Sequence, residues 1–419
     1  MKTQKQKVHI KTVHGYTVVF VPSPIEVVVV RASVYTGFIH ETKKTAGVHH
    51  LLEHVIYNGW KPCHDKCILF WDKQGGSSNA TTDMTVVSYY VKGLPEMTDT
   101  MIDYISTLVA TPRISESVMQ REKKAIISEL ATAMNSPHYK LKNAFNQFFY
   151  IPEGLRYGDD AAQHMKNISS LTVHDLKEAH RVMYTPSNVV FVVYGSFSMS
   201  RILRRMEDEL TNSNPKVSPL ITCFSKRHDF VYVHTPTQNF SIMVGFPLSS
   251  FCQHPLLYSH ILKALLFDAL RTTHDLIYSI HPRIEEDHCS SRILIQFDCM
   301  PHAIQSSLHV LFRTLYQYTH RLMNKDTFNG IQRRTIYHYR TDYPYDMYYS
   351  SYLYTKKPLF TKDQLIRHTR SLTIQHFLTF MKQSILFETC TLAYQGPHKI
   401  PCTWDTFLKI DTHGTYIPL

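Results

Sequence analysis

Short runs of β-branched residues, interrupted by glycine and proline, open the first half of the chain and are typical of strands. Further along, one segment alternates between apolar and polar positions and another is apolar throughout, as expected for a half-buried and a fully buried strand. The predicted strands of this half are Val8–Ile10, Thr17–Val21, Glu26–Tyr35, Thr85–Lys92 and Asn188–Tyr194.

Between these strands, apolar residues recur at the spacing of a helix. The pattern predicts one helix from Gly47 to about Tyr57, an amphipathic helix over Pro95–Val109, and a third that runs from Pro112 past Met134. After a polar link near residues 205–228, strands and helices follow one another again. Strands and helices therefore occur in both halves of the chain.

Two short matches indicate that the second half repeats the first. The sequence SLTV around Leu171 precedes a helix and a strand that ends at Gly195, and SLTI around Leu372 precedes a helix and a strand that ends at Gly396. Both pairs lie 201 positions apart, so the two matches share one register. A common period with the same order of elements favours a duplicated domain.

We therefore predict an α+β fold of two homologous domains, residues 1–205 and 220–419, each a mostly antiparallel sheet packed with helices. The content of 43% hydrophobic and 19% charged residues fits a folded protein. The net charge of +11 could attract nucleic acid. Because Lys and Arg are spread along the chain and no nucleic-acid-binding motif occurs, no specific nucleic-acid partner is predicted.

No apolar run is long enough to span a bilayer, so no membrane partner is expected. The opening sequence MKTQKQKVHI is polar and leads into strand-like sequence, which predicts an intracellular protein without a signal peptide. We expect a reducing compartment and free thiols for the eight cysteines. Cys63 and Cys67 could bind metal, but a lone C-x3-C pair favours two unpaired thiols.

The helix after Gly47 contains the candidate chemistry, an H-x-x-E-H motif formed by His50, Glu53 and His54. Positions four apart lie on one face of a helix, so the two imidazoles can bind one ion. Glu53 lies on nearly the same face and can reach a water on that ion without binding the metal. The alternative is two ordinary surface histidines, since the chain has 26 His residues.

A catalytic zinc takes three protein ligands and leaves one position for water, so one ligand is missing. Glu122 and Glu129 on the third helix are seven residues apart and share a face with Ile126. A carboxylate that faces inward beside such a residue needs a counter-charge or a metal. Either glutamate could be the third ligand on this reasoning.

Five segments, in this order, resemble the pitrilysin, insulin-degrading enzyme and mitochondrial processing peptidase family. They include the zinc helix, a Gly-rich edge strand, paired glutamates, the close of the first domain and an R-x6-Y pair. The segments are Ala46–Gly59, Gly75–Thr82, Glu122–Glu129, Leu171–Gly195 and Leu270–Tyr278.

The resemblance implies a zinc ion held by His50, His54 and Glu129, with Glu53 as the general base and Glu122 orienting a histidine from behind. In the second half it implies that Tyr278 steadies the oxyanion and that Arg271 holds the substrate backbone. It also implies that an extended peptide pairs with the edge strand as an added strand. The residues of that strand are Ser78, Asn79 and Ala80.

The function that the resemblance implies is zinc-dependent endopeptidase activity on peptide or protein substrates. Two such domains are half of the clamshell of the long family members, so we expect a homodimer, or a heterodimer with a related subunit. The family also includes half-size viral members and organelle processing subunits. The rival interpretation is a non-catalytic scaffold or peptide-binding subunit of the same fold.

Overall fold

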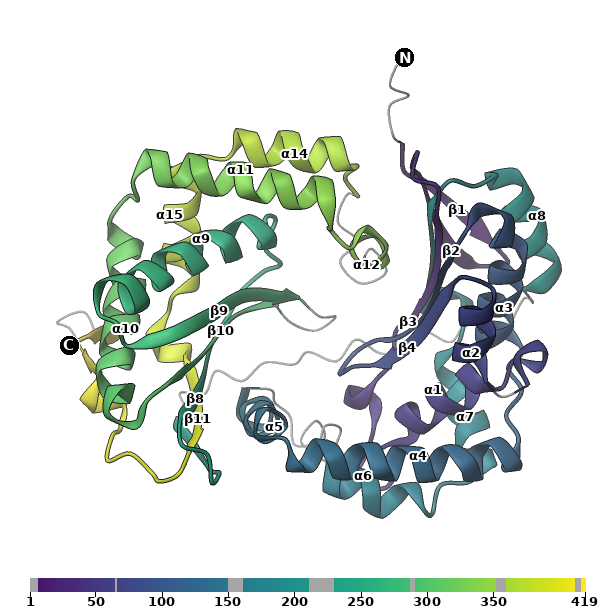
Figure 1. Ribbon diagram of the computed structural model, residues 1–419, viewed down its shortest axis with the longest axis horizontal. Helices are drawn as coiled ribbons and strands as arrows, with labels where there is room; N and C mark the ends of the chain where they lie inside the picture. Colours follow the sequence, from purple (N-terminus) through teal and green to yellow (C-terminus); the bar gives the residue numbers. More distant parts are fainter. Residues whose placement is uncertain are drawn as a thin grey trace. The chain divides into compact units, whose positions relative to one another are not determined.

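The computed structural model (Figure 1) describes residues 7–64, 66–149, 161–210, 230–286, 291–351, 359–410 and 416–419. The chain folds into two compact units. The first unit consists of Met1–Thr132, Glu153–Ile221 and Tyr343–Asp363. The second unit consists of Ala133–Pro152, Thr222–Asp342 and Gln364–Leu419.

A six-stranded sheet forms the centre of the first unit. Its strands are, in spatial order, β1 (His9–Val13), β2 (Tyr16–Pro22), β6 (Val189–Gly195), β3 (Val28–Val34), β5 (Val87–Gly93) and β4 (Ser77–Thr82). Only β2 and β6 are parallel, and the other neighbours are antiparallel. The central strands read as near-continuous apolar sequence because both faces of the sheet are covered.

Helices pack on both faces of this sheet. The helices of the first unit are α1 (Val48–Asn58), α2 (Cys67–Lys73), α3 (Thr98–Ala110), α4 (Glu116–Asn135), α6 (Ala161–Ile168), α7 (Val173–Met183), α8 (Met199–Glu209) and α12 (Tyr345–Ser350). Figure 1 shows α12 on the face opposite α3 and α8. There the ring of Tyr345 stacks on Tyr194, and Asp346 pairs with Arg31 at 2.8 Å.

The second unit repeats this plan with a five-stranded sheet. In spatial order its strands are β7 (Phe230–His234), β11 (Thr391–Gly396), β8 (Phe240–Pro247), β10 (Ser291–Cys299) and β9 (Ile277–Glu286). Again one pair, β7 with β11, is parallel. The helices are α5 (Pro137–Phe149), α9 (Pro255–Phe267), a π-helical turn (Asp268–Thr273), α10 (Ile304–His320), α11 (Lys325–Thr341), α14 (Lys362–Ser371) and α15 (Ile374–Ser384). A small ribbon of β12 (Leu408–Ile410) and β13 (Tyr416–Pro418) completes it.

The repeated sequences occupy equivalent places. Thr172 and Thr373 each form a capping box at the start of a helix, and that helix precedes the strand of the parallel pair, β6 or β11. Two homologous sheets of mostly antiparallel strands confirm the predicted α+β fold. Among the described residues, each unit also includes a helix from the other half of the sequence, α5 in the second unit and α12 in the first.

Candidate active site

The motif residues lie on one face of α1, as the helical spacing predicts. The ring centroids of His50 and His54 are 4.9 Å apart. One ligand atom from each of His50, Glu53 and His54 lies within 4.8 Å of the other two, a grouping that suits a metal ion. The imidazoles are 12% and 22% exposed, and Glu53 is buried.

Helix α4 brings both of its candidate glutamates to the histidines, but to different nitrogen atoms. Glu129 Oε2 lies 3.8 Å from His50 Nε2 and 3.6 Å from His54 Nε2. Glu122 Oε2 lies 3.3 Å from His54 Nδ1, on the other side of that ring. Ligand atoms about 2.0–2.1 Å from a tetrahedral zinc are roughly 3.4 Å apart. The separations of the Glu129 oxygen from the two Nε2 atoms are within a few tenths of an ångström of that spacing.

Burial and the neighbouring carboxylates affect the pKa values of the two histidines in opposite directions. It lowers the pKa of His50 to about 3, so this imidazole is neutral at pH 7, as a metal ligand must be. Burial also acts to lower the pKa of His54, but the bond to Glu122 and the neighbouring carboxylates raise it above its usual value. A carboxylate on Nδ1 fixes the ring so that Nε2 faces the Glu129 oxygen.

The environment of Glu53 differs from that of Glu129. Burial raises the pKa of Glu53 to about 7, against the opposing effects of His54 and of Thr82. The Thr82 hydroxyl donates to Glu53 Oε2 at 3.2 Å. The Glu129 side chain, by contrast, is 58% exposed. A buried carboxyl group that titrates near neutral pH is suited to accept and release a proton.

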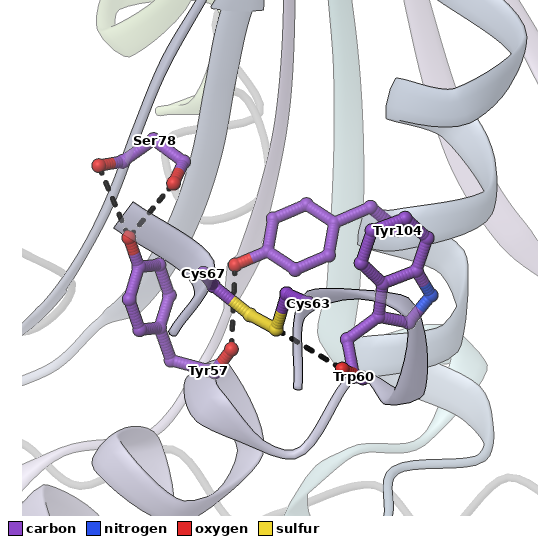
Figure 2. The surroundings of a disulfide bond; sticks show 6 residues. All are labelled: Tyr57, Trp60, Cys63, Cys67, Ser78 and Tyr104. Carbon is purple, nitrogen blue, oxygen red and sulfur yellow. Dashed lines mark hydrogen bonds between the residues drawn. A yellow bond between two sulfur atoms is a disulfide. The ribbon is translucent and has the colours of Figure 1, made fainter. Parts of the chain in front are cut away.

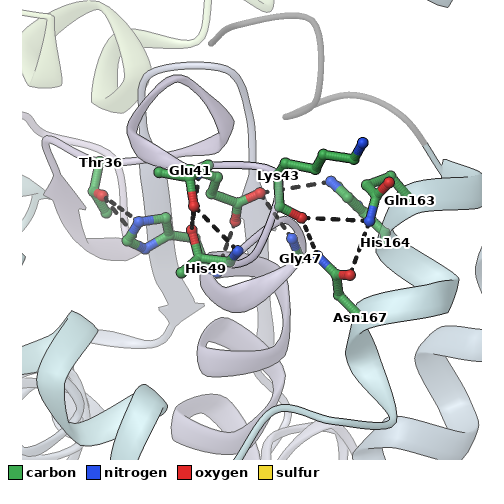
Figure 3. Close-up of polar contacts among 10 residues, drawn as sticks. Thr36, Glu41, Lys43, Gly47, His49, Gln163, His164 and Asn167 are labelled. Carbon is green, nitrogen blue, oxygen red and sulfur yellow. Dashed lines mark hydrogen bonds and ion pairs between the residues drawn. The ribbon is translucent and has the colours of Figure 1, made fainter.

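The N-terminus of α1 is held by a residue outside the motif, Glu41 (Figure 3). Its two carboxylate oxygens accept the backbone N–H groups of Gly47 and His49 at 2.8 and 2.9 Å. His164 Nε2 lies 3.5 Å from the same carboxylate. Burial raises the pKa of Glu41 to about 8, although the two N–H bonds act to lower it. Glu41 therefore caps the helix directly beside His50.

The segment expected to pair with substrate is an edge of the sheet, since β4 is last in the strand order. Ser78, Asn79 and Ala80 lie on it and pair with β5 on one side only. The Tyr57 hydroxyl donates to the Ser78 carbonyl at 3.1 Å and lies 2.7 Å from Ser78 Oγ (Figure 2). Together with the Thr82–Glu53 bond, this fastens the edge strand to α1 at two points four residues apart on each element.

The expectation of free thiols at Cys63 and Cys67 is wrong, because these residues form a disulfide (Figure 2). Cys63 ends a short 3-10 turn and Cys67 begins α2, and the intervening turn brings their Cα atoms to 4.9 Å. That separation is in the ordinary range for disulfides. A C-x3-C spacing does not reveal such a turn from the sequence.

The R-x6-Y pair lies in the second unit, whereas the histidines lie in the first. Arg271 and Tyr278 line one surface cavity of about 250 Å³. Arg271 forms an ion pair with Asp275, and Tyr278 is 84% exposed at the start of β9. The structure thus brings these two predicted residues together at one cavity, with an exposed phenol and a guanidinium paired to Asp275.

Sequence reasoning missed Glu41, Tyr57 and Thr82. Thr82 ends the Gly-rich segment that had been singled out, and Tyr57 is four residues after Glu53, so helical periodicity could have found Tyr57. Glu41 precedes the helix by several residues and had no recognisable spacing. Among the helices that the structure describes, none is both long and apolar enough to cross a membrane.

Two family models match the chain. Residues 17–156 match the model described as Insulinase (Peptidase family M16), and residues 170–335 match Peptidase M16 inactive domain. Mitochondrial-processing peptidase subunit beta of Dictyostelium discoideum is 24% identical over 189 residues, which cover 45% of this chain and 40% of that protein. The uncharacterized zinc protease YmxG of Bacillus subtilis is 26% identical over 168 residues, covering 40% and 41%. The chain matches about two fifths of the length of these relatives.

Solved structures share the fold over nearly the whole chain. A peptidase M16 inactive domain from Pseudomonas fluorescens superposes with a TM-score of 0.81 at 14% identity, covering 94% of this chain and 98% of that one. A protease from Helicobacter pylori gives 0.80 at 18% identity, covering 94% and 100%. The matched models, the relatives and the fold agree with the motifs, and the chain belongs to peptidase family M16, the family of pitrilysin, insulin-degrading enzyme and mitochondrial processing peptidase.

Proposed function

We propose that the protein is a zinc-dependent endopeptidase. The observation that carries the proposal is the convergence of one Glu129 oxygen on both Nε2 atoms of His50 and His54. Three such donors and an exposed side match the ligand set of a catalytic zinc. Two other carboxyl groups lie near the imidazoles. Glu122 lies at Nδ1 of His54, away from the Nε2 atoms, and the bond from Thr82 to Glu53 and the burial of Glu53 suit a base better than a ligand.

Each residue has a distinct task in this proposal. When bound, zinc supplies a water of lowered pKa and polarises the scissile carbonyl. Glu53 Oε2 takes a proton from the attacking water and passes it to the leaving amine nitrogen. Glu122 orients His54, and the free edge of β4 pairs with an extended peptide through Ser78, Asn79 and Ala80. Tyr278 steadies the oxyanion and Arg271 holds the peptide backbone, as in the family pattern.

Two further points concern assembly and the rival function. We propose that the active form contains a second copy of the chain or a related subunit, since one relative is named as the beta subunit of a processing peptidase. The rival is a non-catalytic subunit of the same fold. It is favoured by the match of residues 170–335 to an inactive-domain model. It is opposed by the complete donor set in the first unit.

The test compares wild-type protein with Glu53→Gln and with Glu26→Gln, an exposed glutamate as matched control. Metal content is measured by mass spectrometry and cleavage with a peptide library. We expect about one zinc per chain in all three proteins and loss of cleavage only in Glu53→Gln. Equal cleavage by Glu53→Gln and wild type would remove Glu53 from the mechanism. If all three proteins retain zinc and none of them cleaves the library, even at high protein concentration, the result would favour the scaffold.

A further inference from the structure

A second surface cavity in the second unit is rich in arginine and has no place in the proposed peptidase chemistry. It encloses about 400 Å³ beside α11 and α14. Arg333, Arg340 and Arg370 line it, together with Tyr337 and Asn329. Among the residues that the structure describes, no acidic side chain lines it. We call this feature the arginine cavity.

The cavity is built by two helices that are fastened together. Arg333, Tyr337 and Arg340 are spaced by four and three residues, so they project from one face of α11. Gln332 donates its amide protons to the carbonyl oxygens of Thr369 and Leu372 at 2.8 and 2.9 Å. These bonds hold the end of α14 beside α11, as Figure 1 shows, and place Arg370 at the cavity.

The two helices that line the cavity carry an excess of positive charge. Helices α11 and α14 carry seven Lys and Arg residues against two Asp residues. Within the part of the chain that the structure describes, neither Arg333 nor Arg370 forms an ion pair. Elsewhere in the same unit, Arg271, Arg283 and Arg292 each pair with a carboxylate. Guanidinium groups gathered around one cavity repel one another unless an anion lies between them.

We propose that the arginine cavity binds a small ligand with two or more phosphate groups. The planar guanidinium fork donates two parallel N–H bonds to phosphate oxygens, which is why Arg is preferred for phosphate recognition. The volume lies within the usual range for small-molecule sites and exceeds what one phosphate needs. Tyr337 and Asn329 add neutral donors. The proposal is independent of the peptidase activity, because it uses no residue of the zinc site or the R-x6-Y pair.

The test uses inorganic triphosphate as the probe and a pair of charge-matched double variants. Arg333→Gln with Arg370→Gln removes two cavity guanidiniums. Arg334→Gln with Arg367→Gln removes the same charge from the neighbouring positions of the same two helices, which do not line the cavity. Binding is measured by isothermal titration calorimetry at 0.15 M salt, where diffuse surface attraction is largely screened. Thermal unfolding of each free variant checks that it is folded.

We expect the cavity variant to bind triphosphate at least about tenfold more weakly than wild type, and the control variant to bind within about twofold. Equal weakening in both variants would show a diffuse basic surface and overturn the proposal, as would no binding by wild type at millimolar probe. Co-sedimentation with phosphatidylcholine vesicles containing a phosphoinositide distinguishes the source. Cavity-dependent sedimentation assigns the phosphates to a lipid headgroup, and triphosphate binding without sedimentation assigns them to a free ligand.

Discussion

Replacement of Glu41 tests how far α1, the helix with the H-x-x-E-H motif, depends on a residue outside it. In Glu41→Ala the buried N–H groups of Gly47 and His49 both lose their acceptor. Each unpaired buried N–H costs roughly 1–3 kcal/mol. Some relaxation is expected, so we predict a loss of about 2–4 kcal/mol in the free energy of unfolding. Glu41→Gln keeps one acceptor and should lose about half as much.

The assay has two readings. Urea unfolding of metal-free protein at pH 7 gives the free energy, and competition with a chelator gives the zinc affinity. Because the cap lies beside His50, we expect the zinc affinity to fall in the same order, wild type, glutamine, alanine. Glu26→Ala, on an exposed loop, should stay within about 0.5 kcal/mol of wild type. An alanine variant with unchanged unfolding energy and zinc affinity would refute the capping role.

Three further predictions follow from contacts elsewhere in the two units. Burial acts to raise the pKa of Glu285, but flanking arginines lower it to about 2, so its contribution is present above pH 4.5 and lost as pH falls toward 2. Glu285→Gln should lower the free energy of unfolding by about 1–3 kcal/mol at pH 7, a range reduced because the side chain is partly exposed. The free energy of unfolding from urea titrations should then fall less steeply as the pH is lowered, and an unchanged pH slope would contradict this. On the proposed function, Tyr57→Phe removes the hydrogen bond that holds Ser78 of the edge strand. It should raise the KM for peptides about threefold or more with kcat nearly unchanged, whereas a fall in kcat alone would count against the edge-strand role. Cys67→Ser should lower the free energy of unfolding by about 2 kcal/mol. Alkylation of unfolded wild-type protein without reductant should leave Cys63 and Cys67 unlabelled, and full labelling of both would exclude the disulfide.

The sequence by itself determined the features that depend on local periodicity. The H-x-x-E-H spacing placed His50, Glu53 and His54 on one face of a helix before any tertiary contact was known. The apolar run at Asn188–Tyr194 indicated a buried strand, and the 201-residue period indicated two homologous halves. These inferences succeed because helix and strand geometry relate residues a few positions apart, whatever surrounds them.

Tertiary structure decided everything that depends on contacts between distant segments. Only packing of α4 against α1 sends Glu129 to the Nε2 atoms and Glu122 to Nδ1, although both glutamates share one helical face. Packing also joins Glu41 to the N-terminus of α1 and Thr82 to Glu53. It likewise places α5 and α12 in units built mainly from the other half of the chain. Periodicity states which face a side chain lies on, but the partner on that face depends on which other element buries it.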